Sequence, residues 1–447
     1  MNKIILFRTA ASVLLILGAA FPESDSAAQT STVNAGAPKP ENGQAAISLP
    51  AEKMPHVYDT ENTGADVKKP PMPAFSDLPS IPYLPDPFKK ADGSRITTRE
   101  EWRIRRAEIK AILEHYDVGE KPDKPKTFEA TLEGNTINIT VGEGTRAFNM
   151  TATINQPTGA AAGPIPAIIG VNPPTGSLPA DLFSKRVIAT VTFRAHQVAP
   201  TSFGGIDYAS GNFMKLYPNA TAGYMMRWAW GVSRLIDALE ILPEAGIDTK
   251  RLAVSGCSFQ GKMALYAGAF DERIALTIPQ ESGGGGTISW RYADMLEKRD
   301  NVEVENLLHA QGSNDEFPWY ARALRQFNSD PDKLPFDHHE LIAMIAPRAV
   351  LMIESSQIPR MGAEAARIDA LAAREVWKAL GVPDRMGVTE ANVGHCRWYE
   401  DFTPDLEAYL DRFLLGKEDG QSTDFMRSRF THVDREKWIP WSTPELK

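Results

Sequence analysis

The pattern of hydrophobic and polar residues changes along the chain. Early runs at residues 127–132, 135–141 and 148–154 are strand-like, and the last two alternate apolar and polar side chains with period two. Such alternation predicts antiparallel strands with one face towards solvent. Later runs are denser in apolar residues, which predicts strands covered on both faces, at 164–172, 187–193, 252–254, 274–278, 349–353 and 386–389.

Segments with helical spacing of apolar residues lie between several of these runs. It predicts helices at 97–116, 222–242, 263–270, 363–380 and 405–415. Thr97 or Thr98 stands where an N-cap is preferred, and two glutamates follow in the first turn of that helix. Strands that alternate with helices favour a mostly parallel sheet with helices on both faces.

Residues 251–262 join a buried strand to a buried helix through a tight turn of small residues. Ser258 stands there in a Gly-x-Ser-x-x-Gly motif, one residue longer than the common Gly-x-Ser-x-Gly. A strained turn of this kind presents a serine oxygen above the sheet edge, and the helix N-terminus behind it favours developing negative charge. Ordinary turn chemistry is the alternative explanation for this serine.

The antiparallel start, the parallel remainder and the serine turn together predict an α/β-hydrolase fold. We expect a three-layer sandwich with a mostly parallel central sheet and an antiparallel N-terminal part. A serine nucleophile in this fold needs a carboxylate and a histidine, in that chain order. His395 lies in a late loop before the last helix, where the fold places its catalytic histidine. A histidine that only caps or packs the loop is the alternative.

Two glutamates are candidates for the carboxylate. Glu281 follows the buried run 274–278, and the end of a parallel strand points into the active-site crevice. Four glycines come soon after it and allow close backbone approach. Glu354, directly after the run 349–353, is the second candidate.

A metal site is the other chemistry to consider, because two histidines stand side by side. His338 and His339 have no third ligand at a diagnostic spacing. No metal and no organic cofactor is therefore predicted.

The first 28 residues have the pattern of a secretory signal peptide. Lys3 and Arg8 precede an apolar stretch at 10–20, and small-residue cleavage sites follow. The apolar stretch is short for a bilayer span, although a retained anchor is the alternative. We expect a secreted or periplasmic protein that leaves the membrane after signal cleavage, with a flexible leader at 29–74 and a single catalytic domain at 75–447.

The net charge limits the possible partners, and the cysteine content limits the possible disulfides. The formal net charge of −9 over 447 residues makes nucleic acid and anionic membranes poor partners. The two cysteines, Cys257 and Cys396, stand directly beside Ser258 and His395. An exported compartment permits one disulfide between them, which would bring the serine and the histidine to one place.

These residues resemble the glucuronoyl esterase family of carbohydrate esterases, over about residues 84–415. The resemblance rests on the segments 84–88, 92–93, 256–262, 279–283, 337–339, 345–348 and 394–396. It implies an enzyme that hydrolyses the ester between glucuronic acid of glucuronoxylan, often 4-O-methylated, and an alcohol of lignin. The implied partner is such a lignin–carbohydrate ester, and no cofactor is implied.

The resemblance also assigns roles to individual residues. It implies Ser258 as nucleophile, Glu281 as acid and His395 as base, with the two cysteines bridged. The family's sugar-binding lysine matches Lys262, and a glutamate that holds sugar hydroxyls matches Glu316.

Two positions depart from the family pattern. The family usually has an arginine directly after the nucleophile, where its side chain helps to hold the oxyanion, and this chain has Phe259. The family's tryptophan after the run 349–353 is missing, and Arg360 is a candidate to supply a charge there. These departures favour an esterase of the same family with altered acyl specificity. An inactive carbohydrate-binding homologue is the other alternative, and the complete set of Ser258, Glu281 and His395 argues against it.

The oxyanion donors expected from the sequence are backbone N–H groups. The first is the N–H of Phe259. The second is expected from Thr175 or Gly176, because the preceding Pro173 and Pro174 have no N–H to offer.

Overall fold

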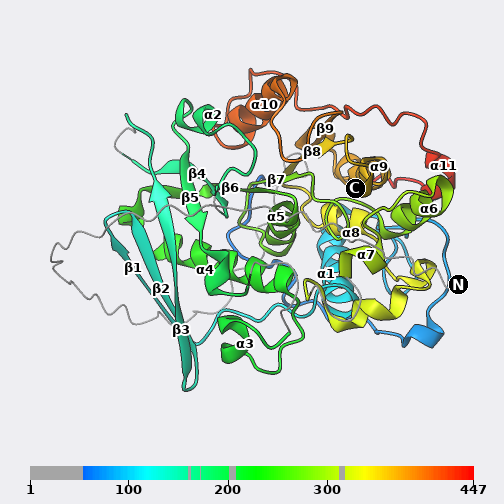
Figure 1. Ribbon diagram of the computed structural model, residues 1–447, viewed down its shortest axis with the longest axis horizontal. Helices are drawn as coiled ribbons and strands as arrows, with labels where there is room; N and C mark the ends of the chain where they lie inside the picture. The colour runs from blue at the N-terminus through cyan, green and yellow to red at the C-terminus, as the bar shows by residue number, and fades with distance from the viewer. Residues whose placement is uncertain (1–53, 160–162, 172, 201–207, 312–317) are drawn as a thin grey trace, which may run out of the picture. The chain divides into compact units, whose positions relative to one another are not determined.

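A mixed nine-stranded sheet forms the centre of the computed structural model, which describes residues 54–159, 163–171, 173–200, 208–311 and 318–447 (Figure 1). These residues belong to the larger of two units in the chain, Ser48–Lys447. The expected signal peptide and the first part of the expected leader lie outside the described residues. None of the helices in the described ranges combines the length and the apolar character that a membrane span requires.

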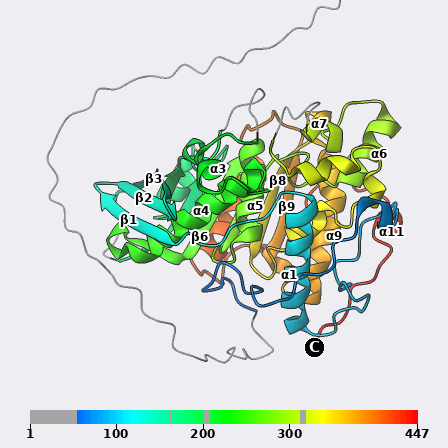
Figure 2. The same cartoon turned by 90° about the horizontal axis from the view of Figure 1, so that it is seen from below.

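The strand order is β1-β2-β3-β5-β4-β6-β7-β8-β9. Strands β1 to β3 pair antiparallel, β3 pairs antiparallel with β5, and the remaining pairs are parallel. Figure 2 shows β1–β3 at the opposite end of the sheet from β8 and β9. The bounds are β1 (Thr127–Glu133), β2 (Thr136–Glu143), β3 (Arg146–Asn155), β4 (Ile165–Gly170), β5 (Ala189–Phe193), β6 (Ile247–Cys257), β7 (Leu276–Gln280), β8 (Ala349–Ser355) and β9 (Met386–Ala391).

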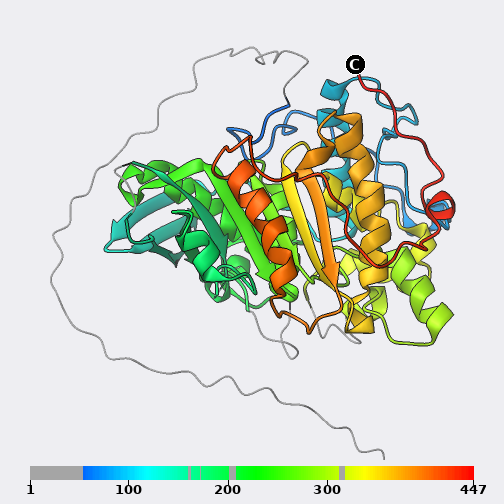
Figure 3. The same cartoon turned by 90° about the horizontal axis from the view of Figure 1, so that it is seen from above.

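Helices cover both faces of this sheet. One apolar core lies under α4, α5 and α9, and a second lies between the other face and α2 and α10. Figure 3 shows α10 crossing that second face. The described helices are α1 (Arg99–Tyr116), α2 (Ala180–Ser184), α3 (Asn212–Leu216), α4 (Tyr224–Ile241), α5 (Phe259–Phe270), α6 (Trp290–Asp300), α7 (Leu307–Gln311), α8 (His338–Ala343), α9 (Ala363–Ala379), α10 (Thr403–Phe413) and α11 (Arg435–Trp438).

These observations confirm the expected α/β-hydrolase architecture. The half-exposed antiparallel strands and the buried parallel strands lie where the two hydrophobic patterns placed them. Strand β2 alternates between buried and partly exposed residues over most of its length, whereas β4, β7 and β8 are buried throughout. Helix α1 begins after Thr98, whose side chain accepts a hydrogen bond from the N–H of Glu101 in a capping box.

Residues 54–74 are held to this unit by polar contacts, although the sequence placed them in the leader. The N–H of Tyr58 donates to the Glu272 carbonyl at 3.1 Å. The Glu61 carboxylate lies 2.6 Å from Lys121 Nζ and also pairs with Arg234. Burial alone raises the pKa of Glu61, but these cations outweigh it and lower the pKa to about 2. The segment is thus held by a backbone hydrogen bond and charge pairs, and Met54 and Met72 also pack against the main apolar core.

Candidate active site

Ser258 lies in the sharp turn between β6 and α5. Its backbone has φ 63° and ψ −129°, a left-handed conformation that costs energy for a residue with a side chain. The turn needs glycine on both sides of the serine. A Cβ on Gly256 would lie 2.5 Å from the Gln260 carbonyl oxygen, and one on Gly261 would lie 2.6 Å from the Gln280 carbonyl oxygen. The predicted strand–turn–helix is therefore present, with Ser258 at its apex.

His395 is hydrogen-bonded to Glu281. The distance from His395 Nδ1 to Glu281 Oε2 is 2.7 Å, and the N–H of Cys396 donates to the same oxygen at 2.8 Å. Glu281 is buried at 2% exposure, and its own N–H donates to the Ile353 carbonyl at 2.7 Å. A carboxylate acceptor favours the tautomer with the proton on Nδ1, which leaves Nε2 as a base.

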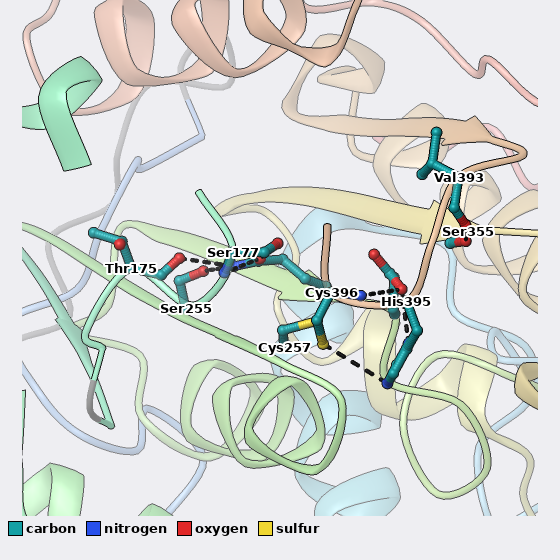
Figure 4. The surroundings of a disulfide bond; sticks show 10 residues. Thr175, Ser177, Ser255, Cys257, Ser355, Val393, His395 and Cys396 are labelled. Atoms are coloured by element: carbon teal, nitrogen blue, oxygen red, sulfur yellow. Dashed lines mark hydrogen bonds and ion pairs between the residues drawn. A yellow bond between two sulfur atoms is a disulfide. The ribbon is translucent and has the colours of Figure 1, made fainter. Parts of the chain in front are cut away.

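A disulfide joins Cys257 to Cys396, with 5.8 Å between their Cα atoms (Figure 4). It ties the residue before Ser258 to the residue after His395. Among the described residues, the Ser258 hydroxyl makes no hydrogen bond to His395, and His395 Nε2 instead lies 3.7 Å from Cys396 Sγ. Catalytic hydrogen bonds are often long without substrate and tighten when it binds.

We expect exported protein to contain no free thiol, because its two cysteines are bonded to each other. Thiol titration of denatured, unreduced protein measures this directly, and two titrated thiols would contradict the bridge. Reduction should lower the thermal unfolding midpoint, because the bridge spans 139 positions and constrains the unfolded chain.

Comparison with known proteins shows the family. A family model described as "Glucuronyl esterase, fungi" matches residues 139–381. The 4-O-methyl-glucuronoyl methylesterase of Hypocrea jecorina is 37% identical over 377 residues, which cover 84% of this chain and 78% of that protein. The methylesterase of Thermothelomyces thermophilus is 35% identical over 397 residues, covering 88% of this chain and 94% of that protein. The chain belongs to the glucuronoyl esterase family.

Solved glucuronoyl esterases have the same fold. The catalytic domain from Hypocrea jecorina matches with a TM-score of 0.78 at 37% identity and covers 84% of this chain and 100% of that one. A mutant enzyme from Sporotrichum thermophile, in complex with methyl 4-O-methyl-beta-D-glucopyranuronate, matches with a TM-score of 0.76 at 37% identity, covering 83% of this chain and 97% of that one. The architecture derived above is therefore the architecture of this family.

The second candidate acid of this family member, Glu354, makes a different contact. Its Oε1 accepts a hydrogen bond from Thr287 Oγ1 at 2.6 Å, while Glu281 holds His395. Glu354 is 2% exposed and lies opposite Glu390 in the β8–β9 register. Burial, aided by the carboxylates of Glu281 and Glu390, raises the pKa of Glu354 to about 8.

Glu354→Gln should stabilise the protein more at pH 9 than at pH 5. The folded chain keeps a proton on Glu354 up to about pH 8, whereas the unfolded chain loses it near pH 4.5. Ionisation therefore costs stability as pH rises through this interval, and the glutamine variant has no such cost. We expect the gain in unfolding free energy to grow by more than about 1 kcal/mol between the two pH values. Urea unfolding at both pH values measures the gain in unfolding free energy. Glu133→Gln, at an exposed position, is the control. An equal gain for Glu354→Gln at pH 5 and pH 9 would refute the prediction.

Lys262 is almost fully buried near the start of α5. Its Nζ lies 2.9 Å from Glu305 Oε2, donates to the Ser282 carbonyl, and stands 5.5 Å from the centre of the Trp319 ring. The N–H of Gly284 donates to the same oxygen of Glu305 at 2.8 Å. Sequence reasoning missed Glu305. Its place beside Lys262 depends on the glycine run, since a Cβ on Gly284 would lie 1.8 Å from the Glu305 carbonyl oxygen.

The remaining expected site residues are Glu316, Arg360, Thr175 and Gly176. Glu316 lies outside the described residues. Arg360 pairs with Glu303 at 3.0 Å, and both side chains are about half exposed. The N–H of Gly176 donates to the Pro173 carbonyl at 3.1 Å, so Thr175 is the better candidate for the second oxyanion donor.

Phe259 is the first residue of α5, and its ring packs among aromatic side chains. The ring lies 6.5 Å from the Trp319 ring at an interplanar angle of 22°, and 6.0 Å from the Trp228 ring at 50°. Phe259 is thus part of an aromatic cluster, with Lys262 on the same tryptophan.

The histidine pair has structural contacts. His338 Nδ1 lies 2.7 Å from the Gly286 carbonyl oxygen, and His339 Nε2 lies 2.9 Å from the Pro85 carbonyl oxygen. Both rings are fully buried, and burial lowers the pKa of His339 to about 4. The two rings therefore hold backbone segments together.

Proposed function

We propose that this protein hydrolyses the ester between glucuronic acid of glucuronoxylan, often 4-O-methylated, and an alcohol of lignin. The observation that carries the proposal is the His395–Glu281 hydrogen bond at the disulfide that joins it to the Ser258 turn. Membership of the glucuronoyl esterase family supports the choice of substrate. A relative's structure contains a methyl glucuronate ester, which is a substrate of this class.

In the proposed mechanism Ser258 is the nucleophile. His395 Nε2 takes the Ser258 proton as the hydroxyl attacks the uronate carbonyl, and Glu281 holds the imidazole and stabilises its charged form. His395 then protonates the leaving alcohol. Water, activated by the same histidine, cleaves the acyl-enzyme and restores the serine.

The oxyanion is proposed to be held by the N–H of Phe259 at the start of α5 and by the N–H of Thr175. In this fold the second donor comes from the loop after the strand beside the nucleophile strand. Here that strand is β4, which pairs with β6. Lys262 and Glu316 are proposed to hold the sugar hydroxyls.

A change of acyl specificity is the alternative function, and Phe259 favours it. An arginine at this position would add a charged donor, whereas phenylalanine adds only apolar surface. The test is turnover of a benzyl glucuronate ester, an acetylated sugar and an aryl acetate. We expect clear preference for the glucuronate ester. Preference for either acetate would support the alternative, and no turnover of any ester would indicate an inactive carbohydrate-binding homologue.

We propose that residues 1–28 are a cleaved signal peptide and that the mature protein is secreted or periplasmic. The positive start and the small-residue cleavage sites support this. We also keep residues 29–74 as the leader and 75–447 as the catalytic domain. The polar contacts of Tyr58 and Glu61 argue that the last part of the leader packs on that domain.

A further inference from the structure

The Gln280 side chain is a fully buried hydrogen-bonding centre behind the catalytic residues. Its Nε2 donates to the Thr175 carbonyl at 3.0 Å and to Ser255 Oγ at 2.6 Å. Its Oε1 accepts from the N–H of Ser177 at 2.9 Å and from the Ser177 hydroxyl. All four hydrogen-bonding positions of the amide are thus used inside the protein.

The main chain at Gln280 also contacts the nucleophile turn. It is the last residue of β7, directly before Glu281, and its carbonyl oxygen accepts from the N–H of Ser258 at 2.9 Å. One residue therefore joins the nucleophile, the acid and the loop at 173–177.

That loop packs tightly against Gln280. A Cβ on Gly176 would lie 2.7 Å from Gln280 Nε2 and 3.1 Å from the backbone nitrogen of Cys257. Gly176 has φ 63°, a conformation that favours glycine. The loop thus rests directly on the strand that ends at the nucleophile.

The loop follows β4, the parallel neighbour of the nucleophile strand β6. In this fold such a loop supplies the second oxyanion donor. The N–H of Gly176 is used within the loop, while the N–H of Thr175 donates to no described residue. The Gln280 amide donates to the carbonyl oxygen of Thr175 and accepts from the N–H of Ser177. It therefore fixes the residues on both sides of Gly176.

We propose that Gln280 is a positioning residue for the oxyanion hole. It holds the loop at 173–177 so that the N–H of Thr175 faces the oxyanion that forms when Ser258 attacks the ester carbonyl. The proposal rests on the proposed esterase function. An amide is suited to the task because it offers two donors and two acceptors without a charge that would compete with Glu281.

The test is Gln280→Met, which keeps an unbranched side chain of similar length and removes all four hydrogen bonds. We expect kcat to fall about 10- to 100-fold, because a displaced oxyanion donor loses contact mainly in the transition state. KM should stay within about threefold. The affinity of phenylboronic acid, which forms a tetrahedral adduct with an active serine, should fall by the same factor as kcat.

Ser177→Ala is the second variant, for the case that Gln280→Met does not fold. It removes one donor to Gln280 Oε1 and leaves the backbone donor in place. We expect a severalfold loss of kcat with KM unchanged. In the Gln280→Met background, Ser177→Ala should have little further effect, since both substitutions act through one contact.

Three results would overturn the proposal. The first is an unchanged kcat in folded Gln280→Met. The second is a loss of kcat/KM that accompanies a loss of thermal stability while boronate binding is no weaker. The third is additive effects of Gln280→Met and Ser177→Ala. If the wild type hydrolyses only the aryl acetate, the same kinetics are measured on that ester. The glucuronate assignment then fails, while the role of Gln280 is still tested. If the wild type hydrolyses no ester, the proposed function fails, and boronate binding still tests the loop.

Discussion

Replacing Ser258 by alanine should lower kcat on a glucuronate ester by at least about a thousandfold while the protein stays folded. Loss of a triad nucleophile in a serine hydrolase typically costs several powers of ten, and the remaining catalysis comes from the oxyanion site and from binding. The positive φ of Ser258 is tolerated because the surrounding turn fixes it, and alanine adds no bulk. Steady-state kinetics on a benzyl glucuronate ester measures the effect.

The control for Ser258→Ala is Ser184→Ala, on the exposed surface of α2. Both variants should unfold at the temperature of the wild type and keep the Cys257–Cys396 bridge. Activity of Ser258→Ala above about a hundredth of the wild type would reject Ser258 as the nucleophile. Unchanged substrate affinity in the alanine variant would separate loss of chemistry from loss of binding.

Local periodicity was enough to predict the strands and helices that carry the candidate site residues. Strand β7 and helix α5 are apolar runs bounded by turn residues, and their own composition determines them. Helix α6 was missed although Ser289 caps it locally, with the Ser289 hydroxyl accepting a hydrogen bond from the N–H of Tyr292. The N–H of Trp290 donates to Asp337 at 2.8 Å, and Ser289 also contacts Asp337. Asp337, 47 positions from Trp290, adds to this local cap, and its contribution leaves no signal near the helix.

The candidate site divides in the same way. Ser258 has a local motif, and His395 and Glu281 follow strands at positions that the fold makes characteristic. Glu305 lies in a polar stretch, and only the folded chain brings it 2.9 Å from Lys262. Gln280 stands in the segment 279–283 that carries the family resemblance, but its four side-chain contacts with other segments leave no local signal.

Residues 54–74 show the limit of composition as a guide. The sequence there is polar and lacks periodicity, which is typical of a leader. Buried partners for the charge of Glu61 come from α4 and from the segment after α1, at Arg234 and Lys121. Charge pairs across such distances in sequence cannot be read from one segment alone.

Phe259→Arg should raise kcat on methyl glucuronate about 10- to 100-fold. Phenylalanine offers the oxyanion only its backbone N–H, whereas a guanidinium adds a charge-assisted donor, and such donors are roughly twice as strong as neutral ones. The loss of one good oxyanion donor typically costs two to three powers of ten in turnover. The gain should appear in kcat rather than in KM, because the new contact strengthens as negative charge develops.

The aromatic surroundings of Phe259 favour this substitution. The aliphatic part of an arginine side chain can pack where the phenyl ring now lies, against the Trp319 and Trp228 rings. The matched control is Phe259→Leu, which is apolar and lacks the charged donor. It should leave kcat near or below the wild-type value, so that a gain in the arginine variant alone identifies the guanidinium as its cause.

The competing explanation is that Phe259 serves specificity by packing against an apolar or aromatic leaving group. The arginine variant would then lose activity on the benzyl ester and gain none on the methyl ester. Steady-state kinetics of wild type, Phe259→Arg and Phe259→Leu on both esters separates the two explanations. An unchanged or lower kcat on both esters would reject the missing-donor explanation. A gain on the methyl ester together with a loss on the benzyl ester would show that one position governs both the oxyanion and the leaving group, since the first requires the guanidinium and the second the ring.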